Sequence, residues 1–303
     1  MSEITYGRPP AGHVPQTENP EGTAVFTEAY AVLPANTQRD IVTSFLPGWD
    51  RTRAWILARP MTGFAETFAQ YAMEVAPGGG SMQPEPDVEA QDALFITHGT
   101  ARLTLGRANI DLRPGHFVYL PRSAVWSLWN TGDEMLYFQW VRKRYCALPG
   151  VQPPEAIVVH ESEVRASDMP DCDGKWATQR FFDPLNMAYD FHMNIVTFLP
   201  GGRIPFAETH VMEHGLYVLQ GRAKYLLNKD WVDVGPGDFM WLRAFCPQAC
   251  IAEGTEPFRY LLYKDVNRHV PLTPGGLTRV EPRMGQIERE GLTRLGAEEV
   301  PRG

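Results

Sequence analysis

The chain has 303 residues, of which 44% are apolar and 21% charged, and its 36 acidic and 28 basic residues give a formal net charge of −8. This acidic balance argues against a nucleic-acid-binding protein, which needs a basic face. The sequence has neither a long apolar run that would span a membrane nor the basic and apolar segments of a signal peptide. Its four cysteines form no C-x-x-C pair. We therefore expect a cytoplasmic protein with no nucleic-acid or membrane partner.

The sequence contains the same plan twice. A shift of 122 positions, without a gap, aligns the turn residues of two copies: Gly80 with Gly202, Gly99 with Gly221, Pro114-Gly115 with Pro236-Gly237, and Gly132 with Gly254. Such a match predicts two homologous domains. In chain order we expect an N-terminal arm at 1–40, an N-terminal barrel at 41–150, a linker at 151–185, a C-terminal barrel at 186–270, and a tail at 271–303 with a short helix near Gln286–Leu295.

Short apolar runs between Gly and Pro turns fill both copies. Leu94-Phe95-Ile96 and Phe117–Leu120 are examples in the first copy, and Leu216–Leu219 and Phe239–Leu242 are examples in the second. Runs of this length and regular spacing, rich in aromatic and β-branched residues, are typical of an all-β sandwich or barrel. We therefore predict an all-β protein with two antiparallel jelly-roll barrels in one chain.

Polar residues at characteristic intervals distinguish the second copy. Glu208 and His210 are two residues apart, so on a strand both would point to one face. His214 follows four residues later, and Gln248 comes ten residues after the turn at Pro236-Gly237-Asp238. These intervals resemble the two motifs of the cupin family, in which three His and one Glu usually converge inside the barrel. This chain has Glu, His, His and Gln at the corresponding positions.

This donor set can still bind a metal ion. Two neutral imidazoles, one carboxylate and one amide oxygen leave two positions open, which suits six-coordinate Mn²⁺ or Fe²⁺ better than Zn²⁺ or Cu⁺. In the first copy the corresponding positions hold Pro86, Val88, Asp92 and Trp126. Proline and valine cannot ligate a metal ion, and the tryptophan would fill the cavity. We therefore expect one metal ion per chain, in the C-terminal barrel, and a structural, metal-free N-terminal barrel.

The last strand of the second copy offers further polar groups. Period-two alternation would place Tyr260, Leu262 and Lys264 on one face. If that face is the interior, the Lys264 ammonium needs an anion beside it. Periodicity alone equally allows the opposite arrangement, with Tyr263 inside and Lys264 in water. Tyr225 lies on another strand, where it could be either a core residue or a binding residue.

A closer resemblance covers both barrels, over roughly residues 20–270. The stretches Glu208–Gly215, Asn228–Trp231, Pro247–Ala249 and Tyr263–Arg268 resemble the (S)-ureidoglycine aminohydrolases, a family of bicupins that includes proteins labelled glyoxylate-induced. The resemblance implies a Mn²⁺-dependent hydrolase that releases ammonia from (S)-ureidoglycine, giving (S)-ureidoglycolate, in purine and allantoin catabolism. It implies the metal ligands Glu208, His210, His214 and Gln248, the substrate-binding residues Glu208, Tyr225, Tyr260 and Lys264, and catalytic roles for Glu208 and Lys264.

Two other interpretations remain open. A metal-dependent cupin dioxygenase would need O₂, and the loss of the usual three-His pattern weighs against it. A non-catalytic bicupin would use its metal only to anchor a small molecule. Because jelly-roll barrels expose sheet edges and faces that often pair, we also expect a homo-oligomer, with a small-molecule substrate as its other partner.

Overall fold

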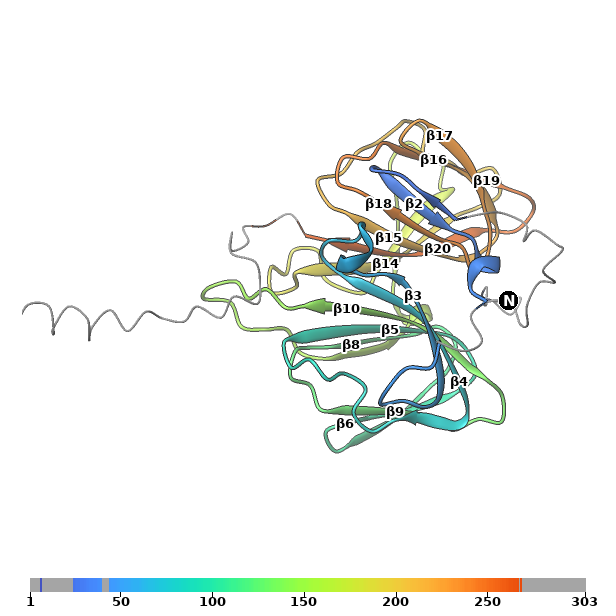
Figure 1. Ribbon diagram of the computed structural model, residues 1–303. Helices are drawn as coiled ribbons and strands as arrows, with labels where there is room; N and C mark the ends of the chain where they lie inside the picture. The colour runs from blue at the N-terminus through green and yellow to red at the C-terminus, as the bar shows by residue number, and fades with distance from the viewer. Residues whose placement is uncertain (1–5, 7–23, 40–43, 267, 269–303) are drawn as a thin grey trace, which may run out of the picture. The chain divides into compact units, whose positions relative to one another are not determined.

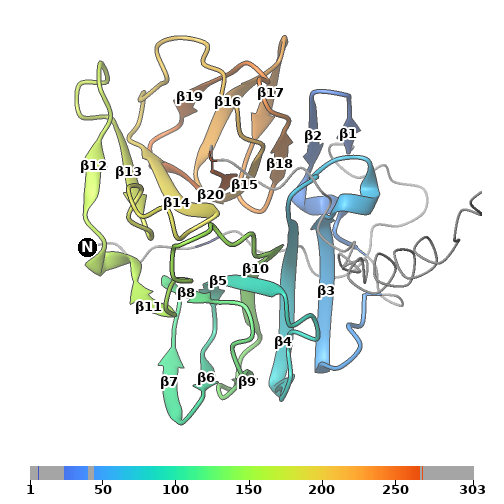
Figure 2. The ribbon, with the colours of Figure 1, turned by 90° about the vertical axis from the view of Figure 1, so that its left-hand side faces the viewer.

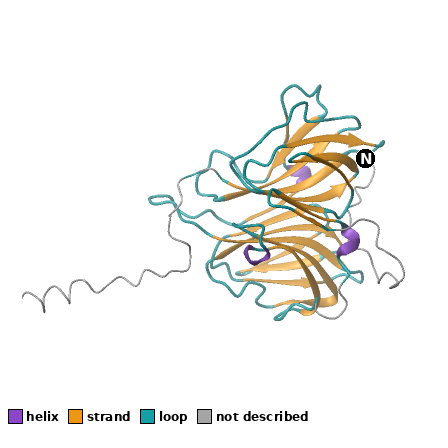
Figure 3. Cartoon of the chain, turned by 45° about the horizontal axis from the view of Figure 1, so that its top comes forward, coloured by secondary structure: helices purple, strands orange, loops and turns teal. Residues whose placement is uncertain are grey.

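The structure, a computed structural model, describes residues 6, 24–39, 44–266 and 268. The expected tail at 271–303, with its helix near Gln286–Leu295, lies outside these residues. The described part is almost entirely β-structure, as predicted, and Figure 3 shows its few helical turns between the strands. These are 3-10 turns at Ala35–Thr37 (η1), Pro60–Thr62 (η2) and Glu161–Glu163 (η3). No helix in this part is long and apolar enough to cross a membrane.

One antiparallel sheet forms the N-terminal barrel (Figure 1). Its strands run in the order β11-β8-β5-β10-β4-β9-β6-β7, and β3 pairs with β4. The sheet folds over because β4 pairs with β10 along most of its length but with β9 at its end. The strands are β3 (Asp50–Ala58), β4 (Ala69–Ser81), β5 (Ala90–His98), β6 (Ala101–Leu105), β7 (Ala108–Leu112), β8 (His116–Leu120), β9 (Trp126–Asn130), β10 (Leu136–Arg144) and β11 (Ile157–His160).

Two antiparallel sheets form the C-terminal barrel (Figure 2). The larger has the order β1-β2-β18-β15-β20-β14-β13-β12, and the smaller has the order β17-β16-β19. The strands are β1 (Val25–Phe26), β2 (Tyr30–Leu33), β12 (Ala166–Asp168), β13 (Trp176–Arg180), β14 (Phe191–Phe198), β15 (His214–Gln220), β16 (Arg222–Leu227), β17 (Asp230–Val234), β18 (Phe239–Leu242), β19 (Gln248–Glu253) and β20 (Phe258–Asp265).

The glycines that reveal the repeat occupy equivalent turns. Gly99 follows β5 with φ +74°, and Gly221 follows β15 with φ +73°. A Cβ would lie 2.6 Å from the Met135 carbonyl oxygen at Gly99, and 2.3 Å from the Pro257 carbonyl oxygen at Gly221. Only glycine tolerates both the left-handed backbone and this close approach, so the repeated spacing has a structural cause.

Strands also form in the segments expected to be an arm and a linker. The β1–β2 hairpin lies within 1–40 and extends the C-terminal barrel, because β2 pairs with β18. Within 151–185, β11 pairs with β8 of the N-terminal barrel, whereas β13 pairs with β14 of the C-terminal barrel. A sheet edge offers unpaired N–H and C=O groups to any adjacent extended segment. These pairings depend on which segments meet in space, so local composition did not reveal them.

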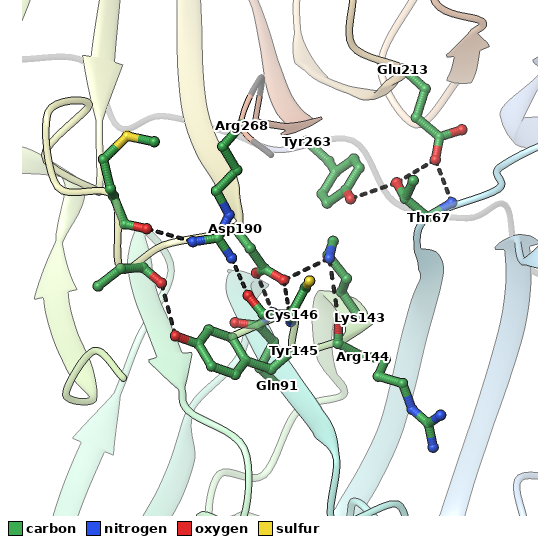
Figure 4. Close-up of polar contacts among 12 residues, drawn as sticks. Thr67, Gln91, Lys143, Arg144, Tyr145, Cys146, Asp190, Glu213, Tyr263 and Arg268 are labelled. Carbon is green, nitrogen blue, oxygen red and sulfur yellow. Dashed lines mark hydrogen bonds and ion pairs between the residues drawn. The ribbon is translucent and has the colours of Figure 1, made fainter. Parts of the chain in front are cut away.

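Three clusters of buried side chains build the hydrophobic core. One fills each barrel, and the third lies between them, where Phe68 of the N-terminal half stacks on Tyr263 with ring centroids 3.9 Å apart. Polar contacts border this third cluster (Figure 4): Lys143 forms a buried ion pair with Asp190, with 2.7 Å between Nζ and Oδ2. The two barrels therefore share a core, and they belong to one compact unit.

Candidate metal centre and active site

Two segments of the C-terminal barrel bring the predicted metal ligands together. Glu208 lies in the loop before β15, and Gln248 is the first residue of β19. The two backbones exchange hydrogen bonds, with 2.9 Å from each N–H nitrogen to the other residue's carbonyl oxygen. His214 is the first residue of β15. The predicted ligands therefore lie at the first residues of β15 and β19 and in the loop before β15.

The four side chains line one small cavity of about 110 Å³. Glu208 Oε1 lies 3.3 Å from His210 Nε2 and 3.2 Å from Gln248 Nε2. The rings of His210 and His214 have centroids 5.0 Å apart. The intervals along the sequence thus correspond to a real convergence of one carboxylate, two imidazoles and one amide.

Burial keeps one of the imidazoles neutral. His214 is 4% exposed, and desolvation, together with the nearby His210 and Lys264 charges, lowers its pKa to about 3. A neutral imidazole is the form that binds metal ions. The donors therefore fit a divalent ion by their chemistry, although no three His, Cys, Asp or Glu side chains in the described residues already form a metal-binding group.

The remaining predicted site residues occupy two different positions. Tyr260 and Lys264 line the cavity, whereas Tyr263 points into the core shared by the barrels, which resolves the alternative that periodicity left open. Tyr225 is fully buried behind the cavity, where its hydroxyl donates a hydrogen bond of 2.9 Å to Gln248 Oε1. In this arrangement Tyr225 holds the amide of Gln248.

Several cavity residues were not identified from the sequence. They come from β13, β14 and the loop before them, and they are Met169, Trp176, Thr178, Arg180, Asn194 and Val196. The available signal was the alternation of Trp176, Thr178 and Arg180, which is a strand pattern with one polar inner face. Composition predicts a linker over 151–185, and this prediction hides the alternation.

The corresponding residues of the N-terminal barrel interact with each other. Arg142 stands where the repeat places Lys264, and it forms an ion pair of 2.5 Å with Glu85. Trp140 Nε1 donates to Asp92 Oδ1 at 2.8 Å, and Asp92 stands where the repeat places His214. Burial, followed by the Glu85 charge, raises the pKa of Asp92 well above its usual value. These side chains satisfy one another and offer no imidazole to an ion.

Comparisons with known proteins agree with this fold. The family model described as a cupin domain matches residues 71–142 and 194–263, one match in each barrel, which confirms the predicted bicupin architecture. A glyoxylate-induced protein of Pseudomonas aeruginosa, so described in its crystal structure, is 53% identical, with a TM-score of 0.83 over 89% of this chain and 99% of that one.

Curated relatives, including the following two, carry an enzyme's name. The (S)-ureidoglycine aminohydrolase of Arabidopsis thaliana is 32% identical over 247 residues, which cover 81% of this chain and 78% of that protein. The (S)-ureidoglycine aminohydrolase of Escherichia coli K12 is 27% identical over 237 residues, 78% of this chain and 89% of that protein. The chain belongs to the (S)-ureidoglycine aminohydrolase family.

Proposed function

We propose that this protein is an enzyme that hydrolyses (S)-ureidoglycine to (S)-ureidoglycolate and ammonia, a step of purine and allantoin catabolism. Water adds its hydroxyl to the α-carbon, and the α-amino group leaves as ammonia. The observation that carries the proposal is the gathering of Glu208, His210, His214 and Gln248 with Tyr260 and Lys264 around one small cavity. The names of the relatives support the same reaction.

The proposed cofactor is one Mn²⁺ ion in the C-terminal barrel. Glu208 and Gln248 would hold it through oxygen, and His210 and His214 through nitrogen. When bound, such an ion supplies a Lewis acid beside the substrate. The mixed nitrogen and oxygen donor set supports Mn²⁺ over Zn²⁺, which prefers thiolates and imidazoles in closed sites.

The chain's own residues bind the substrate and move a proton. Lys264 pairs with a substrate oxygen, and Tyr260 orients the ureido group. The leaving amine must gain a proton, and the Glu208 carboxyl group is the proposed carrier because it lies at the cavity between His210 and Gln248. We expect Glu208→Gln to lose most turnover, and near-normal turnover with metal retained would reject this role.

The decisive experiment supplies freshly generated ureidoglycine to Mn²⁺-loaded protein and follows both ammonia and the chirality of the product. We expect ammonia release with (S)-ureidoglycolate as product, at the same rate with and without oxygen. A requirement for oxygen would indicate a dioxygenase instead. No turnover, combined with tight binding of ureidoglycolate, would indicate a non-catalytic binding protein.

The assembly and location belong to the same proposal. The larger sheet of the C-terminal barrel and the sheet of the N-terminal barrel end at β12 and β7, and such edges can pair with another copy. We propose a cytoplasmic homo-oligomer. Light scattering coupled to size-exclusion chromatography measures its mass, and a single-chain mass would contradict it.

A further inference from the structure

Strand register places an arginine and an asparagine side by side on the inner wall of the cavity. Arg180 of β13 pairs with Asn194 of β14, and Asn194 pairs in turn with Leu262 of β20. Directly paired residues on neighbouring strands point to the same face of a sheet. All three line the cavity, together with Lys264, which lies two residues further along β20.

Two cations therefore face one cavity. Arg180 reaches the cavity from β13 and Lys264 reaches it from β20. Within the described residues neither Arg180 nor Lys264 forms an ion pair, and Glu208 is the one carboxylate that lines the cavity. Glu208 is already assigned to the metal. Two half-buried cations that form no ion pair within the described residues are unfavourable, so the cavity favours an anionic ligand.

The asparagine adds an unused hydrogen-bonding group. Asn194 is 3% exposed, and its buried Oδ1 has no hydrogen-bond partner in the described part of the chain. Nε1 of Trp176, which lines the same cavity, also has no partner there. Buried polar groups in native proteins are usually paired, and a bound ligand is one way to satisfy them.

We propose that Arg180 and Lys264 together bind the carboxylate of the substrate, and that Asn194 hydrogen-bonds to the neutral polar group next to it. The ligand class is a small carboxylate that carries an amide or ureido group. Its identification as ureidoglycine rests on the proposed function. In this proposal Arg180 makes the site select substrates with a free carboxylate over uncharged analogues.

The test compares charged and uncharged ligands. In Arg180→Gln we expect KM for ureidoglycine, and the inhibition constant of ureidoglycolate, to rise roughly tenfold to a hundredfold, since one charged hydrogen-bonded contact is lost. The inhibition constant of the uncharged ureidoglycolate carboxamide should stay within about twofold, because that ligand offers no anion to pair. We expect kcat to change less than KM. Arg165→Gln, which alters an exposed arginine just before β12, is the matched control and should change none of these constants.

Two further variants keep the test valid if Arg180→Gln folds poorly. Arg180→Lys keeps the charge and should restore most of the affinity for ureidoglycolate. Asn194→Asp keeps the shape but adds a carboxylate next to Arg180, so it should weaken binding of the charged ligand and spare the carboxamide. Equal effects on both ligands, or no effect on either, would overturn the proposal.

The test of the carboxylate site can succeed or fail independently of the test of the proposed reaction. If wild-type protein releases no ammonia from ureidoglycine, calorimetric titration with ureidoglycolate still compares wild type with Arg180→Gln. A selective loss of carboxylate binding in the variant would then support the carboxylate site while the assigned reaction fails. Normal turnover in wild type with unchanged constants in the variant would leave the reaction standing and remove Arg180 from it.

Discussion

At the scale of single residues, the proposed metal centre depends on Tyr225, which is buried behind the cavity and does not line it. Gln248 is a neutral amide among charged or basic donors, and its orientation is fixed by hydrogen bonds at both ends. Its Oε1 accepts from Tyr225, and its Nε2 donates to Glu208. A group that hydrogen-bonds to a metal-binding side chain orients that side chain, and this commonly changes the affinity of the site for the metal ion.

Tyr225→Phe should therefore weaken metal binding. The variant removes only the hydroxyl that holds Gln248, and a positioning group of this kind typically contributes roughly tenfold to a hundredfold in affinity. Titration with Mn²⁺, followed by electron paramagnetic resonance of the free ion, measures the change. If Tyr225 instead contacted substrate directly, KM would rise and the metal affinity would stay unchanged.

The same scale shows what sequence can and cannot predict. Glu208, His210 and His214 were identifiable because their intervals follow strand and loop geometry within one segment, and Gln248 follows a recognisable turn. Arg180 was missed because its place in the cavity depends on β13 pairing with β14, a contact between separate segments. The position of Tyr225 behind the cavity likewise depends on the pairing of its strand, β16, with β19.

At the scale of elements, a loop of the N-terminal half holds the segment that carries the proposed metal ligands His210 and His214. The buried Glu213 carboxylate accepts from the backbone N–H groups of Glu66 at 3.0 Å and Thr67 at 2.5 Å, and from Trp241 Nε1 at 2.9 Å. The Thr67 hydroxyl also contacts Glu213 and lies 2.9 Å from the hydroxyl of Tyr263 (Figure 4). Since Glu213 precedes His214, this network sets where β15 begins.

Glu213→Gln should destabilise the fold and loosen the metal site together. The NH₂ group that replaces one carboxylate oxygen cannot accept the hydrogen bonds which that oxygen receives, and one charged hydrogen bond contributes about 1.5–3 kcal/mol. Urea unfolding measures the stability, and Mn²⁺ titration measures the affinity. Glu256→Gln, an exposed change, is the control. A loss of stability with unchanged Mn²⁺ affinity would show that the hydrogen bonds of Glu213 do not position the metal-binding side chains.

The end of β20 gives a pH-dependent prediction. Burial, together with the Glu213 charge, raises the pKa of Asp265 to about 6, although hydrogen bonds from the backbone N–H groups of Glu213 and Asp265 itself oppose this. The folded state then binds this proton more tightly than the unfolded chain does. Stability from this group is present below the ordinary aspartate pKa and is lost as pH rises through about 6. The unfolding free energy of wild type minus that of Asp265→Asn should therefore fall from about pH 4 to about pH 6.5 and then level off. The exposed change Asp168→Asn should show no such fall.

At the scale of the whole molecule, the N-terminal barrel contributes to the architecture of the candidate site. The two barrels meet through aromatic rings, and Gly215, next to His214, makes room for one of them. A Cβ at Gly215 would lie 2.6 Å from Phe68 Cζ. The start of β15 is thus packed against the N-terminal half, so the N-terminal barrel supports the position of His214.

This shared core predicts that the two barrels unfold together. Phe68 is 1% exposed and stacks on Tyr263 of the other barrel, so Phe68→Ala should cost about 3–5 kcal/mol, the usual range for removing a buried aromatic ring. Because the lost contacts belong to both halves, the single calorimetric transition should move to a lower temperature without splitting. The exposed change Phe45→Ala should leave it nearly in place. Two separate transitions in wild type, with only one of them moved by Phe68→Ala, would mean that each barrel is stable alone and that the N-terminal half does not support the site.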